Sequence, residues 1–169
     1  MSYQHQYLDG TRIHFPLGKV VCVGRNYAEH ARELNNPVPT EPLLFIKPGS
    51  CVVPLDDSFS IPDDRGAVHY EAEIAVLIFA PALDLTLREL QDQLKAKSYP
   101  WEVAKSFDGA CVLAAFVPGD AVEDLSDIGI RLSLNGEVRQ DGNSRDMLNP
   151  ILPLIQHICG HFSLQPGDV

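Results

Sequence analysis

The chain has 169 residues, so we expect residues 1–169 to form a single domain with a substantial core rather than two domains. Its 13 basic and 23 acidic residues give a formal charge of −10, which argues against nucleic acid or an anionic membrane surface as a partner. A small anionic substrate held by a few local cations remains compatible with this charge. Hydrophobic residues make up 45% and charged residues 21%, as in soluble globular proteins, and no apolar run reaches transmembrane length.

The cysteines indicate the cellular compartment. Cys22, Cys51, Cys111 and Cys159 lie far apart, form no CxxC pair and are flanked by apolar or small residues. We therefore expect buried free thiols in a reducing cytoplasm, and the first residues show no signal-peptide character.

Short apolar runs predict the first elements. Residues 20–24 are expected to form a buried strand that ends at a glycine, and residues 43–47 form a second strand stopped by a Pro-Gly pair. A helix is expected between them, with Asn26 as N-cap, Glu29 three residues later, and an end near Pro37.

Residues 68–78 are rich in β-branched and apolar side chains and predict a third strand. Glu71 and Glu73 are two residues apart, so both carboxylates point to the same face of this strand. Two sheltered anions repel each other and lose hydration, which a bound cation or a shared proton would offset. Mg²⁺ or Mn²⁺ suits such oxygen ligands. The alternative is an edge strand whose charged face lies in water.

Three more elements follow along the chain. Residues 86–94 begin with a capping-box pattern and carry a leucine stripe, which predicts a helix. Residues 130–139 predict a hairpin with Asn135-Gly136 as its two-residue turn, and a last helix is expected from Pro150 to Cys159. Several strands with few helices favour a mainly β, α+β domain.

Two further groups could carry chemistry. His30 and Glu33 are three residues apart on the first predicted helix, where a carboxylate could orient an imidazole as a general base. The alternative is a weak surface pair. Lys105 lies in the aromatic segment 101–109 and could hold a substrate carboxylate or stabilise an enolate. The alternative there is a lysine whose stem covers neighbouring rings.

Four segments occur in a fixed order: residues 24–30, 44–48, 70–73 and 101–108. Together they resemble the fumarylacetoacetate hydrolase family, particularly its small acylpyruvase and oxaloacetate decarboxylase or tautomerase members. The resemblance covers nearly the whole chain from Val20 to Val169. It implies a mixed β-roll fold with a few short helices, a bound Mg²⁺ or Mn²⁺, and a homodimer.

The resemblance also assigns residues of this chain to a site. The metal ligands would be Glu71, Glu73 and Asp84. The catalytic residues would be His30, Glu33 and Lys105, and the substrate-binding residues would be Arg25, Lys47, Arg88 and Gln91.

The implied activity is that of a Mg²⁺-dependent hydrolase of aromatic catabolism. It would cleave a C–C bond in a small β-diketo acid of the acylpyruvate or fumarylpyruvate type, through a metal-stabilised pyruvate enolate, with water activated by His30. Oxaloacetate decarboxylation or tautomerisation, or isomerisation of a 2-hydroxy-diene-dioate, is the alternative on the same site. A truncated relative that binds metal or an α-keto acid without turnover is the alternative of another class.

The interval between Glu73 and Asp84 is shorter than in the family. A strand from Glu73 to Ile78 travels about 16 Å, and the six steps back to Asp84 cover at most about 20 Å, with no slack for a turn. We therefore expect that mobile residues near 78–82 are absent from this sequence. The resemblance further implies a C-terminal segment after Val169 that is also absent from it.

Overall fold

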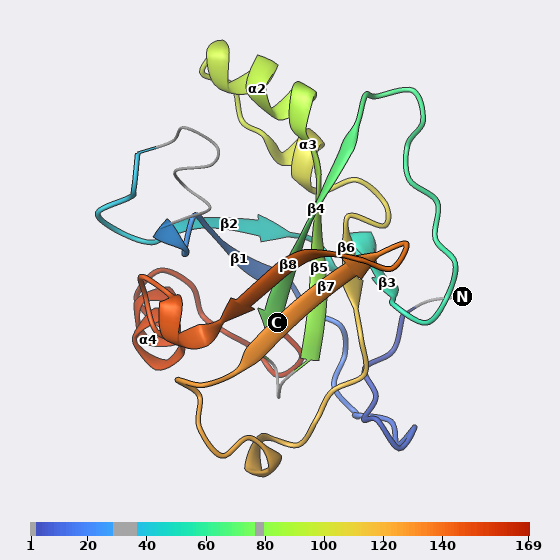
Figure 1. Cartoon of the computed structure of the whole chain (residues 1–169), viewed down its shortest axis with the longest axis vertical. Coiled ribbons are helices and arrows are strands. Elements are labelled where there is room, and N and C mark those ends of the chain that lie inside the picture. The colour runs from blue at the N-terminus through green and yellow to red at the C-terminus, as the bar shows by residue number, and fades with distance from the viewer. Residues whose placement is uncertain (1–2, 29–36, 77–79) are drawn as a thin grey trace.

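The computed structural model describes residues 3–28, 37–76 and 80–169. Its centre is a four-stranded mixed sheet in the order β3-β6-β5-β4 (Figure 1). The strands are β3 (Val52–Pro54), β6 (Cys111–Leu113), β5 (Ala80–Leu87) and β4 (Val68–Ala75). β3 runs parallel to β6, whereas the β6–β5 and β5–β4 pairs are antiparallel.

Two smaller antiparallel sheets complete the β structure. One pairs β1 (Val20–Gly24) with β2 (Leu43–Lys47), and both strands have the predicted bounds. The other pairs β7 (Gly129–Leu134) with β8 (Glu137–Asn143). Their connection is the predicted turn, with φ of 53° at Asn135 and 83° at Gly136. Two successive positive φ values are what a type I′ hairpin turn requires.

The helices formed by the described residues lie outside these sheets. They are α2 (Arg88–Ala96), α3 (Glu102–Lys105) and α4 (Ile151–His161), and Figure 1 shows α2 near one end of the central sheet and α4 to its side. Three short 3₁₀ turns cover Gly49–Cys51, Gly119–Ala121 and Ser144–Asp146. The mainly β, α+β class is confirmed. In the described part of the chain, no helix is long and apolar enough to cross a membrane.

The predicted start of the second helix is wrong. Thr86 is a strand residue opposite His69 on β4, and its buried hydroxyl caps no helix. The helix begins two residues later, after Leu87, which provides no side-chain cap. Pairing of residues 80–87 with β4 outweighs the local capping pattern, because the buried strand satisfies its backbone groups in the sheet.

The β4–β5 hairpin brings its two strands back together. Glu71 faces Asp84 directly, and the last pair before the turn is Ala75 with Ala80. The short interval therefore does return Asp84 to the glutamates. The expected absence of residues near 78–82 concerns a turn whose residues 77–79 lie outside the described part, so it stays a prediction.

A side chain from the second hairpin covers the outer edge of β4. The Gln140 amide accepts a hydrogen bond from the Ala72 N–H at 2.7 Å and donates one to the Ala72 carbonyl at 3.2 Å. It thereby replaces a neighbouring strand at that position. The core lies on both sides of β5 and β6 and includes the buried residues Leu85, Leu87, Val112, Leu113 and Phe116.

The expectation of buried free thiols is confirmed for some of the four cysteines. All four cysteines are free; Cys51 and Cys111 are buried and Cys22 is half-buried. Cys159, on α4, is exposed. Burial raises the pKa of the Cys111 thiol to about 12, so it is an unreactive core residue.

Candidate active site

Three carboxylates lie together on the β4–β5 hairpin, and we call them the carboxylate cluster: Glu71, Glu73 and Asp84. Glu71 and Glu73 share a face because they are two residues apart on β4. Asp84 joins them from β5 as the cross-strand neighbour of Glu71. Asp84 is buried, and both glutamates are half-buried. The alternative of a charged strand face in water is therefore excluded.

Basic side chains surround the carboxylate cluster. The Lys105 ammonium lies 2.6 Å from Asp84 Oδ2 and 3.8 Å from Glu71 Oε2. Arg88 donates from Nη2 to Glu71 Oε1 at 2.8 Å and from Nη1 to Gln91 Oε1 at 3.0 Å. Three of the residues assigned from the resemblance, Lys105, Arg88 and Gln91, are thus brought to the carboxylates.

Lys105 is itself 5% exposed, and its ammonium lies over the Phe45 ring at 4.9 Å from the centroid. Phe45 packs in turn near Trp101, with ring centroids 6.0 Å apart. The alternative of a stem covering Trp101 or Phe107 is not what these contacts show, because the ammonium itself lies over Phe45 and is held by carboxylates. A buried ammonium so paired can bind an anion at the same place.

Lys47 has a different environment from the one expected of a substrate-binding residue. Its side chain is fully buried, and its ammonium donates to the backbone carbonyls of Leu85 at 3.2 Å, Ala110 at 2.9 Å, and Lys105. It also lies 2.9 Å from Asp84 Oδ1. Its ammonium therefore already has partners within the protein interior.

The electrostatics of the carboxylate cluster are unfavourable for a third anion. Burial, with the negative charges of Asp84 and Glu71, raises the pKa of Glu73 to about 8, although Lys105 opposes this. A group in such a position is stabilised by sharing a proton or by a cation nearby.

The donor set fits a hard divalent cation in type and location. All candidates are carboxylate oxygens, and Asp84 Oδ1 is buried without a hydrogen-bond donor. As the side chains stand, no three His, Cys, Asp or Glu residues within the described ranges are arranged as a complete metal site. The basic side chains pair with Asp84 and Glu71 instead, so the assignment of the three ligands stays a prediction.

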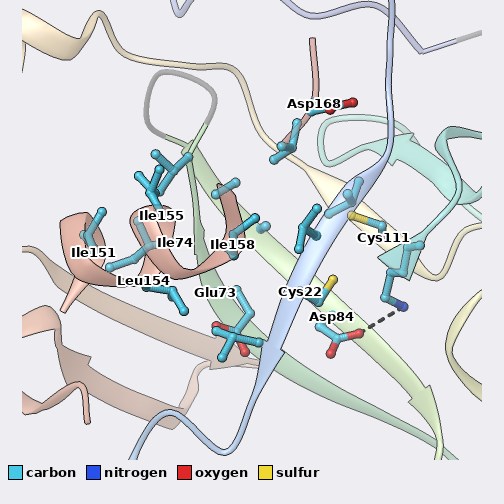
Figure 2. Close-up of a pocket in the computed structure, with 18 of the residues that line it drawn as sticks. Cys22, Glu73, Ile74, Asp84, Cys111, Ile151, Leu154, Ile155, Ile158 and Asp168 are labelled. Carbon is cyan, nitrogen blue, oxygen red and sulfur yellow. Dashed lines mark ion pairs between the residues drawn. The ribbon is translucent and has the colours of Figure 1, made fainter. Parts of the chain in front are cut away.

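A cavity of about 390 Å³ opens beside the carboxylate cluster (Figure 2). Glu73 and Asp84 lie in its wall, together with Cys22 of β1. The opposite wall is apolar and is formed by α4, whose Leu154 and Ile158 point toward the strands in Figure 2. The cavity therefore offers a polar end for an anionic group and an apolar remainder.

Other predicted site residues contribute less. His30 and Glu33 lie outside the described residues, so the proposed dyad stays a prediction. Arg25 immediately follows β1 with a φ of 60°, a left-handed conformation that is uncommon for arginine. Asn26, expected as a helix cap, exchanges hydrogen bonds with Asn149, donating to its carbonyl and accepting from its backbone N–H.

Gln140 is a site residue that sequence reasoning missed. Its two hydrogen bonds hold the backbone of Ala72, between Glu71 and Glu73. Its position on a predicted hairpin gave no signal of this contact, because β4 and β8 are distant in the chain.

Comparison with known proteins agrees with this architecture. The model of the family described as fumarylacetoacetate (FAA) hydrolase, C-terminal, matches residues 19–81 and 77–169. The oxaloacetate tautomerase YcgM of Escherichia coli is 42% identical over 186 residues, which cover 99% of this chain and 85% of the relative.

Solved structures give the same result. A fumarylacetoacetate hydrolase family protein from Yersinia pestis superposes with a TM-score of 0.94 at 42% identity, covering 98% of this chain and 85% of that one. Fumarylpyruvate hydrolase from Pseudomonas aeruginosa, solved with Mn²⁺ and pyruvate, gives a TM-score of 0.89 at 29% identity, covering 99% and 81%. With its sheets, its carboxylate cluster and these matches, the chain belongs to the fumarylacetoacetate hydrolase family.

Proposed function

We propose that this protein is a divalent-metal-dependent enzyme that interconverts the keto and enol forms of oxaloacetate. The observation that carries the proposal is the carboxylate cluster with Lys105 and Arg88 beside it, two of whose carboxylates, Glu73 and Asp84, line the cavity. The same cluster would serve C–C hydrolysis, which the resemblance first suggested. The 42% identity to an oxaloacetate tautomerase favours tautomerisation.

The chain's own residues would bind and orient a small dianion. Lys105 and Arg88 are the cations nearest the cluster, and both are at least half-buried, so their interaction with a substrate carboxylate is screened less than at the surface. Gln91 is buried and accepts a hydrogen bond from Arg88, which fixes the guanidinium plane. Substrate orientation is expected to follow from this fixed plane.

Tautomerisation moves one proton from C3 of oxaloacetate to the oxygen on C2, with no net change in composition. A divalent cation held by Glu71, Glu73 and Asp84 would supply a Lewis acid that favours negative charge on that oxygen. His30 remains the candidate for carrying the proton. The apolar α4 wall would limit the access of water, which suits proton transfer without hydrolysis.

C–C hydrolysis is the second candidate, supported by the similarity to fumarylpyruvate hydrolase at 29% identity. Decarboxylation of oxaloacetate shares the same need for enolate stabilisation. The three reactions differ in product, so one substrate panel separates them.

The test is to assay the purified protein on oxaloacetate, an acylpyruvate and fumarylpyruvate, each with Mn²⁺, Mg²⁺ or a chelator. Enol absorbance reports tautomerisation, and pyruvate formation reports decarboxylation or hydrolysis. We expect metal-dependent loss of the oxaloacetate enol signal faster than pyruvate appears. Pyruvate release from an acylpyruvate alone would replace this proposal with hydrolysis, and Mn²⁺ binding without any turnover would support the non-catalytic alternative. A homodimer in the cytoplasm is also proposed, and sedimentation of the purified protein tests the dimer.

A further inference from the structure

Lys47 connects the two sheets that border the site. It is the last residue of β2, in the β1–β2 sheet, and its ammonium reaches across to β5 and to the loop that precedes β6. A lysine that is 0% exposed is rare, because an unpaired buried ammonium is strongly unfavourable. The Lys47 ammonium must therefore be stabilised by polar or charged groups around it.

The hydrogen bonds of this ammonium can be accounted for completely. An ammonium has three N–H donors, and three backbone carbonyls accept from it: Leu85, Lys105 and Ala110. Asp84 Oδ1 lies 2.9 Å away but receives no hydrogen bond. Lys47 thus forms an ion pair with Asp84 Oδ1, while three backbone carbonyls accept its hydrogen bonds.

The three carbonyls belong to the residues that matter for the site. Leu85 directly follows Asp84 on β5, and Lys105 is the other cation on Asp84. Ala110 closes the loop after α3 and accepts from the backbone N–H of Leu85 at 2.9 Å. One ammonium therefore joins the backbone beside Asp84 to the backbone of Lys105.

We propose that Lys47 is a positioning residue that presets Asp84 and Lys105, and that it does not bind substrate. It orients the Asp84 carboxylate so that Oδ1 is available to a divalent cation, and it anchors α3 so that the Lys105 ammonium meets Asp84 Oδ2. This role rests on the proposed function, because Asp84 and Lys105 belong to the proposed site. Asp84 and Lys47 both line the cavity, and the dashed line at Asp84 in Figure 2 marks an ion pair there.

The experiment compares Lys47→Met and Lys47→Arg with the parent and with a matched control, Lys19→Met. Lys19 also forms an ion pair with a sparsely exposed aspartate, Asp168, and donates to a backbone carbonyl, that of Ser163. It belongs to neither the carboxylate cluster nor the cavity wall. Calorimetric titration with Mn²⁺, kcat and KM for oxaloacetate, and amide hydrogen exchange over residues 105–110 are measured at a temperature where every variant is folded.

We expect Lys47→Met to weaken Mn²⁺ binding several-fold and to lower kcat about tenfold or more with a smaller change in KM, because a small misplacement of a site group is costly. Hydrogen exchange over residues 105–110 should accelerate. Lys47→Arg should not rescue these losses, since a planar guanidinium does not reproduce the directions of three N–H bonds. Lys19→Met should lower the melting temperature while leaving kcat and Mn²⁺ binding unchanged.

Parent-like Mn²⁺ affinity and kcat in folded Lys47→Met, with only a lower melting temperature, would overturn the proposal. Should both Lys47 variants fail to fold, NMR of ¹⁵N-lysine in the parent decides. The proposal requires the Lys47 Nζ resonance to shift when Mg²⁺ binds, and an unchanged resonance rejects it. A parent that binds Mn²⁺ but turns over no substrate would overturn the proposed function alone. The role of Lys47 would still be tested by Mn²⁺ affinity, by amide hydrogen exchange and by the Lys47 Nζ resonance, none of which needs turnover.

Discussion

Asp84 is the direct cross-strand neighbour of Glu71, and the Lys105 ammonium touches both carboxylates, at 2.6 Å and 3.8 Å. Like charges opposite each other on adjacent strands destabilise a sheet. This hairpin tolerates them because three basic side chains reach the same place. The charge arrangement is thus costly for folding and useful for binding a cation and an anion together.

Removal of one carboxylate should separate the cost of the carboxylate cluster to folding from its contribution to cation binding. Glu73→Gln keeps the shape of the side chain but removes a carboxyl group whose pKa is raised to about 8 by burial and by the charges of Asp84 and Glu71. At pH 7 we expect the metal-free variant to be more stable than the parent by about 1–2 kcal/mol, because Glu73 must take up a proton on folding and glutamine need not. Mn²⁺ affinity should fall at least about tenfold, since a charged ligand is lost. Urea unfolding and calorimetry measure the two quantities.

The control for this variant is Glu137→Gln, an exposed carboxylate on the β7–β8 hairpin. It should change neither stability nor Mn²⁺ affinity appreciably. A less stable Glu73→Gln protein with parent-like Mn²⁺ affinity would contradict our description of the carboxylate cluster.

Arg88→Lys should reduce the affinity for an anionic substrate. The guanidinium binds Glu71 and Gln91 at once, and an ammonium cannot reproduce this two-pronged geometry. We expect KM for oxaloacetate to rise about tenfold, corresponding to about 1.4 kcal/mol. Arg131→Lys is the matched control, because Arg131 also binds a carboxylate, Asp141, but at an exposed site. Equal KM values for the two variants would remove Arg88 from substrate binding.

Gln140→Ala should loosen the edge of β4. Two half-buried hydrogen bonds to Ala72 are lost, and we expect a loss of about 1–2 kcal/mol in the free energy of unfolding. Hydrogen exchange at the Ala72 amide should accelerate more than at other β4 amides. Val138→Ala, an exposed substitution on the same strand, should stay within about 0.5 kcal/mol of the parent. Unchanged exchange at Ala72 in Gln140→Ala would show that the contact does not hold the strand.

Asp168→Asn should lower stability in a pH-dependent way. Burial opposes ionisation of Asp168, but hydrogen bonds from the Lys19 side chain and from the backbone N–H groups of Gln165 and Lys19 together hold the pKa of its carboxyl below the ordinary value of 3.8. A lowered folded-state pKa means that this stabilisation is present above pH 3.8 and is lost as the pH falls through the folded-state pKa. At pH 7 we expect the variant to be about 2 kcal/mol less stable.

The difference between Asp168→Asn and the parent should shrink as the pH is lowered below 3.8, when the parent carboxyl also becomes neutral. Asp141→Asn serves as the control, because its ion pair with Arg131 is exposed and contributes little. Urea unfolding over a pH series provides the measurement. A difference that is constant with pH would mean that the lost shape of the carboxylate, not its charge, is responsible.

Some elements could be predicted because their signals are local. β1 and β2 have their expected bounds, since each is a short apolar run stopped by glycine or proline. The Asn135-Gly136 turn was predicted for the same reason: the two residues that accept positive φ are adjacent in the sequence. α4 begins after Pro150, as expected, and extends two residues beyond Cys159.

Other elements could not be predicted from local patterns. Thr86 has a capping pattern but lies in a buried strand, because pairing with His69 of β4 decides its conformation. β3 and β6 are three residues each and carry too few residues to show a periodicity.

The sequence alone determined that Glu71 and Glu73 share one face, because alternation along a strand is a property of the local backbone. It also determined a mainly β protein with an Asn-Gly hairpin, since these follow from short-range patterns. Only the tertiary structure decided that Asp84 lies opposite Glu71 and that the Lys47 ammonium is buried among three carbonyls and a carboxylate. Strand register and burial are set by contacts between residues far apart in the chain, which no local pattern records.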